Sequence, residues 1–149
     1  MKLGEPLAER KKIINKLLKS PQSSHTLNFR FQHIELPVIG LPLELLKYRI
    51  ENGREYWDIK EYEEQNKLIE GYFLDNKEDL KIQEQMHDWL YERAIRGEED
   101  LRKEYDKPGA TQMHPIIINN RTDGFVGFVV DGNRRLSLWR QMYDLDPNK

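Results

Sequence analysis

Residues 131–135 read DGNRR, and their types suit the binding of a phosphate group. They follow the apolar run VGFVV and precede LSLW, so they stand where a strand would turn into a helix. A helix N-terminus offers unpaired backbone N–H groups and a partial positive charge. Glycine lets a ligand approach that backbone, and arginine guanidinium groups match phosphate oxygens. Asp131, Gly132, Asn133, Arg134 and Arg135 therefore form a candidate phosphate-binding corner.

Two interpretations of this corner stay open from the residues alone. Asp131 can cap the helix, or it can act as a catalytic acid or base that holds a metal ion or a hydroxyl group. The structural alternative is that Asp-Gly forms an ordinary turn and that the paired arginines lie in solvent.

Other titratable residues could complete such a site. His114 either faces the pocket as an acid or base or only packs, and the four histidines show no metal-binding spacing. Three carboxylates flank Arg54, namely Glu51, Glu55 and Asp58. Mg²⁺ prefers one or two carboxylates together with phosphate oxygens, so Asp131 and Glu51 are the expected metal ligands. The alternative is that these carboxylates are solvated or pair with arginine.

Length and composition limit the class of protein. A chain of 149 residues fits one domain, and its formal charge of -2 gives no general footprint for nucleic acid. Cysteine is absent, which excludes disulfides, thiolate zinc sites and cysteine nucleophiles. No apolar run reaches the roughly 20 residues of a membrane span, and no signal peptide is recognised, so a soluble cytoplasmic protein is expected.

The elements that would position these residues follow an α+β order without regular βαβ alternation. Residues 1–22 are expected to form an N-terminal helix or arm, and residues 23–149 one domain with a helical insert at about 58–108. Within the insert, one helix is expected to stop near Gly71 and the next to have Asp75 or Asn76 as its N-cap. Residues 21–31 are expected to be a loop, and 33–41 a short β-prone segment. The run MHPIIINN, the turn TDG and the run FVGFVV predict a hairpin, and NRRLSLWRQMYDL predicts a helix. Aromatic residues at 48–73 favour core packing, with base stacking as the alternative.

Two stretches resemble the ParB/sulfiredoxin superfamily. QMHPIIINN followed by GFVVDGNRRLSLWRQ is similar to its Q-x-P-I strand, second strand and G-x-R-R box, and LPLELLKYRIENGRE is similar to its opening strand and N-x-R element. The resemblance spans roughly residues 34–142 and is absent in the long helical middle. DGNRRL is also similar to the DGQQR box of phage-defence nucleases.

The resemblance implies a small mixed sheet with packed helices that binds a nucleotide, with its phosphates lying against the box helix. Gly132 would then permit phosphate approach, and Arg134 and Arg135 would contact phosphate or brace the box. Arg54 would be a second contact, and Gln112 would line the pocket. The full set implied for phosphate or nucleotide binding is Gly132, Asn133, Arg134, Arg135, Arg54, Asn52 and Gln112.

The expected function is therefore that of a nucleotide-binding domain, with or without NTPase activity. Its expected ligand is ATP or CTP with Mg²⁺. The domain would be the N-terminal part of a DNA-linked plasmid, phage or defence protein, or a reduced stand-alone version. The alternatives are a metal-dependent nuclease or DNA-binding domain, and a non-catalytic interaction module that forms a homodimer or binds a partner through its N-terminal helix. The sulfiredoxin reductase activity is excluded, since it needs a cysteine in the box and Asn133 stands in that region.

Overall fold

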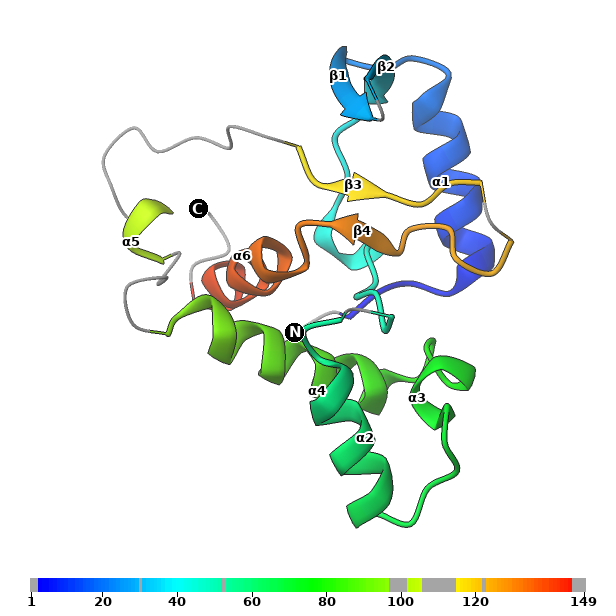
Figure 1. Ribbon diagram of the computed structural model, residues 1–149. Helices are drawn as coiled ribbons and strands as arrows, with labels where there is room; N and C mark the ends of the chain where they lie inside the picture. The colour runs from blue at the N-terminus through cyan, green and yellow to red at the C-terminus, as the bar shows by residue number, and fades with distance from the viewer. Residues whose placement is uncertain are drawn as a thin grey trace.

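The computed structural model describes residues 3–29, 31–51, 53–96, 102–105, 115–121 and 123–145. Helices and two small antiparallel sheets share the chain, which confirms an α+β protein (Figure 1). The elements in chain order are α1 (Leu7–Leu18), β1 (Ser23–Phe29), β2 (Gln32–Val38), the 3₁₀ turn η1 (Leu43–Leu45), α2 (Tyr56–Gln65), α3 (Tyr72–Asp75), α4 (Leu80–Ala94), α5 (Arg102–Tyr105), β3 (Ile117–Ile118), β4 (Val129–Asp131) and α6 (Asn133–Leu145). Among these helices, none is long and apolar enough to cross a membrane.

The strands of the described residues form two separate antiparallel pairs, β1 with β2 and β3 with β4. A parallel bridge between Lys47 and Phe128 joins the segment after η1 to the second pair. The Lys47 amide donates to the Gly127 carbonyl at 2.9 Å, and the Val129 amide donates to the Lys47 carbonyl at 2.9 Å. Parallel and antiparallel contacts therefore meet at β4, and the strands of the described residues form two pairs where the resemblance implied a small mixed sheet.

The expectation of a loop at 21–31 is wrong, because β1 occupies most of that segment. In its pairing with β2, His25 lies opposite Leu36 and Leu27 lies opposite Ile34. Residues opposite each other share a face of the hairpin, so this face is largely apolar. In the sequence, a polar threonine and asparagine alternate with His25 and Leu27, and the two serines ahead of them obscure the period-two pattern. Figure 1 shows this hairpin projecting at the top, away from α2, α3 and α4.

The core lies between α4, α6 and the segment that follows η1. Helix α4 packs against α6, and the buried side chains come from all three parts of the chain. The central residues are Leu46, Tyr48, Phe73, Met86, Leu90, Val129 and Leu136. The core interpretation of the aromatic residues holds for Tyr48 and Phe73, but Trp57 is 74% exposed.

Helix α1 packs on the domain through one buried side. Ile14 is fully buried, and Arg10 is buried with its Nε donating to the Val126 carbonyl at 2.9 Å. Arg10 also forms an ion pair with Glu78, the residue that precedes the α4 cap. The sequence favours packing of this helix on the domain, and the structure shows that packing. In the alternative, a partner that binds α1 would have to meet its exposed side.

Two helix boundaries differ from the sequence prediction. The N-cap of α4 is Asp79, whose carboxylate accepts from the Lys81 amide at 2.8 Å, and not Asp75 or Asn76. Helix α2 ends at Gln65, ahead of the expected stop near Gly71. Several neighbouring residues in 75–79 could cap a helix, so the local sequence does not single out one of them.

His87 sits in the core and provides a pH-dependent element of stability. Its Nδ1 lies 2.6 Å from the Tyr48 hydroxyl, and its Nε2 lies 3.4 Å from Oε1 of Gln141. Burial is the main reason that the pKa of His87 is lowered from 6.5, with the positive charge of Arg140 adding to it, although the Gln141 contact opposes the change. Burial also raises the pKa of Tyr48 to about 12, so its hydroxyl stays protonated beside the ring.

We expect the free energy of unfolding to fall as pH drops below about 6.5. The unfolded chain binds a proton at His87 at a higher pH than the folded protein does, so the free energy of unfolding falls by up to about 1.4 kcal/mol per pH unit. Urea unfolding of the wild type and of His87→Gln between pH 8 and 5 measures this pH dependence of the free energy. The variant should show a flatter dependence. His33→Gln, at an exposed hairpin position, is the matched control and should keep the wild-type slope. Equal slopes in wild type and His87→Gln would contradict the expectation.

Candidate functional site

The candidate site begins at the junction between β4 and α6. Asp131 ends the strand, Asn133 starts the helix, and Gly132 between them has a φ of +107°. A Cβ at Gly132 would lie 2.8 Å from Cγ1 of Ile116 and 3.0 Å from Nη2 of Arg135. Only glycine fits this turn, because both the backbone conformation and the surrounding atoms oppose a side chain.

A cavity of about 360 Å³ opens at this junction, and we call it the arginine cavity. It is lined by Arg49, Arg54, Val130, Asp131, Gly132, Asn133, Arg134 and Arg135. Arg54 lies in the turn before α2, so the fold brings it to the box from more than seventy positions away. The structure thus places Arg54 and the whole of residues 131–135 around one space.

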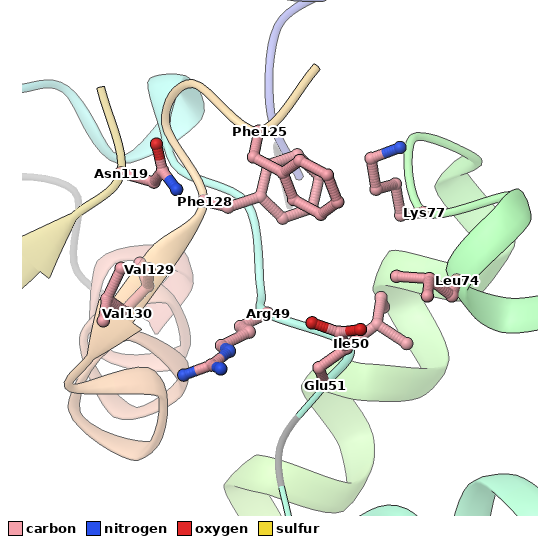
Figure 2. Close-up of a pocket in the computed structure, with 10 residues that line it drawn as sticks. All are labelled: Arg49, Ile50, Glu51, Leu74, Lys77, Asn119, Phe125, Phe128, Val129 and Val130. Atoms are coloured by element: carbon pink, nitrogen blue, oxygen red, sulfur yellow. The ribbon is translucent and has the colours of Figure 1, made fainter. Parts of the chain in front are cut away.

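Arg49 is a lining residue that the sequence reasoning missed. Its neighbours Tyr48 and Ile50 are buried, whereas Arg49 is exposed. The sequence KYRI alternates polar and apolar residues and would have pointed to Lys47 and Arg49 as outward residues, of which Arg49 is exposed and Lys47 is buried. Figure 2 shows the Arg49 guanidinium directed toward the side of β4 and α6.

Asn133 supports the cavity from within. It is 7% exposed, and its side-chain oxygen accepts from the Arg49 amide at 3.1 Å. Its side-chain nitrogen donates to the Val129 carbonyl at 3.4 Å. Asn133 therefore ties the segment that carries Arg49, which follows η1, to Val129 of β4 and the first turn of α6, in addition to lining the cavity.

Asp131 lies at the exposed side of the arginine cavity. Its carboxylate is 3.6 Å from Nη2 of Arg135, and its side chain is 69% exposed, against 19% for Arg135. Among the lining residues it is the acid that faces four arginines. The cavity is therefore strongly positive although the whole chain carries a charge of -2.

The expected metal pair is not brought into one space. Asp131 lines the arginine cavity, whereas Glu51 lines the neighbouring one. In the part of the chain that the structure describes, no group of three or more histidine, aspartate or glutamate side chains could hold a metal ion. A bound Mg²⁺ would need phosphate oxygens beside Asp131 to complete its ligands.

Three expected site residues, Asn52, Gln112 and His114, lie outside the described residues.

The neighbouring space, which we call the aromatic cavity, has a volume of about 300 Å³ (Figure 2). It is lined by Arg49, Ile50, Glu51, Leu74, Lys77, Asn119, Phe125, Phe128, Val129 and Val130. Arg49 and Val130 line both cavities, so the two spaces adjoin.

The turn that carries Arg54 is anchored by Glu55. Glu55 is fully buried, and its carboxylate oxygen lies 3.3 Å from Nε of Arg93 on α4, which also pairs with Asp58. Neither oxygen of Glu55 has a hydrogen-bond partner among the described residues. Burial is the main reason that the pKa of Glu55 is raised, against the attraction of Arg93.

Replacing Glu55 by glutamine should stabilise the protein at pH 7.5 and change little at pH 4. A carboxyl group whose folded pKa is raised loses stability as pH rises above the unfolded value of 4.5, and glutamine removes that charge. The expected gain in the free energy of unfolding at pH 7.5, measured by urea unfolding, is on the order of 1 kcal/mol. Asp58→Asn, which removes the other Arg93 partner, is the control and should not stabilise. A Glu55→Gln protein less stable than wild type at pH 7.5 would show that attraction to Arg93 outweighs burial.

In comparisons with known proteins, no protein-family model, curated protein or solved structure matches the chain.

Proposed function

We propose that this chain is a nucleotide-binding domain of the ParB/sulfiredoxin type and that the arginine cavity holds the phosphates. The observation that carries the proposal is the convergence of two distant chain segments, residues 49–54 and residues 131–135, on one cavity. Both segments lie in the two stretches that resemble the superfamily. In this proposal, nucleotide binding makes the domain the switch of a larger DNA-linked protein.

The chemistry of the cavity favours a ligand with several negative charges. Four guanidinium groups and one carboxylate, that of Asp131, line the space, so the balance of charge there favours an anionic ligand. The N-terminus of the 13-residue α6 adds the positive partial charge of the helix dipole at the same place. A triphosphate supplies several oxygens that can accept hydrogen bonds from the guanidinium groups. Mg²⁺ bound to the triphosphate would meet the carboxylate of Asp131.

Thermal unfolding with ATP, CTP, GTP, UTP and ADP, each with and without Mg²⁺, tests the proposal. A nucleotide at 100 times its dissociation constant stabilises the fold by about 2.7 kcal/mol. The unfolding midpoint should then rise by roughly 5–10 °C. Release of inorganic phosphate, measured in the same samples, shows whether the nucleotide is hydrolysed.

Arg134→Ala should abolish the rise, because it removes one of the guanidinium groups that line the arginine cavity. Arg96→Ala is the matched control: Arg96 is 69% exposed and pairs with Glu92 on α4, outside both cavities. No shift with any nucleotide at several millimolar, or an equal loss in both variants, would remove the proposal.

A second candidate is metal-dependent cleavage of DNA, favoured by the exposed carboxylate of Asp131 beside the arginines. In that case the arginine cavity would meet backbone phosphate, and binding would weaken steeply with salt. Nicking of plasmid DNA with Mg²⁺ or Mn²⁺, lost in Asp131→Asn, would support it. Absence of nicking together with a nucleotide-induced shift would decide for the first function.

A further inference from the structure

The aromatic cavity adjoins the arginine cavity but has a different chemistry. Its walls include the side chains of Ile50, Leu74 and Val129, and two phenylalanine rings form one side. The Phe125 and Phe128 rings meet edge to face, with centroids 5.6 Å apart. In Figure 2 the rings lie across the space from Ile50 and Arg49. The two rings are inclined to each other, so this side of the cavity is an apolar aromatic wall made of one ring face and one ring edge.

The polar groups of this cavity stand around its rim. The Lys77 ammonium lies over the Phe125 ring, 4.6 Å from its centroid, so a cation already contacts one face of that ring. Glu51 supplies a carboxylate at an exposed position. The Asn119 side-chain oxygen accepts from the Arg121 amide at 3.0 Å, which fixes how its amide is presented. Apolar walls with a few polar rim groups suit a flat heteroaromatic ring whose edges form hydrogen bonds.

The position of the aromatic cavity also matches the layout of a nucleotide. Arg49 and Val130 form the boundary between the two cavities. A ligand whose phosphates meet Arg134 and Arg135 would therefore extend past Arg49 toward Phe125. Phe125 is half-buried, whereas Phe128 is 2% exposed and belongs to the core, so Phe125 is the ring available to a ligand.

We propose that the aromatic cavity is a base-binding subsite, in which the base of a nucleoside phosphate contacts Phe125 and hydrogen-bonds to the rim. This inference rests on the proposed function, since the same ligand places its phosphates in the arginine cavity. Inorganic triphosphate would then occupy only part of the site and bind more weakly than a nucleoside triphosphate.

The test compares ATP, CTP, GTP and UTP with inorganic triphosphate, all with Mg²⁺, by titration calorimetry on the wild type and on Phe125→Leu. Leucine keeps an apolar side chain and removes the ring face. We expect at least one nucleotide to bind about ten-fold more weakly to Phe125→Leu, with inorganic triphosphate binding unchanged. Arg134→Ala should weaken both ligands. Phe31→Leu is the matched control, because Phe31 is fully exposed on the β1–β2 hairpin.

The outcomes separate the two proposals. Equal affinity of the wild type for inorganic triphosphate and for every nucleotide would overturn the base subsite and leave the phosphate site standing, and this comparison needs no variant. An unchanged nucleotide affinity in Phe125→Leu would also overturn the base subsite. Absence of binding by every ligand would remove the phosphate site and the base subsite together.

Discussion

Replacement of Arg10 by methionine should lower the free energy of unfolding by about 3 kcal/mol. Arg10 is fully buried, and it donates to the Val126 carbonyl at 2.9 Å and to the Glu5 carbonyl at 2.5 Å. Its guanidinium pairs with both carboxylate oxygens of Glu78 and lies 5.5 Å from the centroid of the Phe128 ring. Methionine has a similar helix propensity and fills much of the same volume, so the change isolates these polar contacts.

The neighbouring residue provides the control for this prediction. Lys11 also reaches from α1 toward the β3–β4 connection, where it pairs with Asp123, but its side chain is 40% exposed and that of Asp123 is 88% exposed. Exposed pairs contribute little, so Lys11→Met should cost no more than about 0.5 kcal/mol. Urea midpoints with unchanged slopes measure both variants. Similar losses at the two positions would show that the buried network of Arg10 has no special role.

Replacement of Gly132 by alanine should cost about 3 kcal/mol and also weaken nucleotide binding. The φ of +107° is unfavourable for alanine, and the new Cβ would meet Ile116 and Arg135 within 3.0 Å. Because Arg135 must move to admit the methyl group, the arginine cavity changes shape. Urea unfolding and a nucleotide titration of the same protein measure the two effects.

Gly71→Ala is the control that distinguishes backbone strain from steric overlap at Gly132. The φ of Gly71 is +85°, yet a Cβ there would meet no atom within 4 Å among the described residues. Gly71→Ala should therefore cost only about 1–2 kcal/mol, from the left-handed conformation alone, and should leave nucleotide binding unchanged. If both glycine variants lose the same stability and the same affinity, crowding at Gly132 does not shape the cavity.

The sequence by itself was sufficient for features that depend on neighbours in the chain. Pro6 and Pro21 bracket the apolar stripe of α1, and the helix lies between them. The change from an apolar run to DGNRR predicted the strand-to-helix junction that β4 and α6 form. These signals are local, because caps, turns and periodicity act within a few residues. The α+β class followed from the order of such segments.

Local signals did not suffice where several neighbouring patterns compete. The β1 strand was missed because its polar residues concealed an apolar face that only pairing with β2 reveals. The cap of α4 fell on Asp79 because more than one nearby residue could accept from the first helical amides. Pairing and packing select among such alternatives.

Only the tertiary structure decided which distant residues share the site. It placed Arg49 and Arg54 beside Arg134, set Glu51 in the adjoining cavity, and opened the space beside Phe125. It also buried Arg10, which its sequence position on a basic helix does not indicate. The physical reason is that a side chain's own type and spacing define its chemistry, whereas its neighbours across the fold depend on how α1, α4, α6 and the strands bury their apolar faces together.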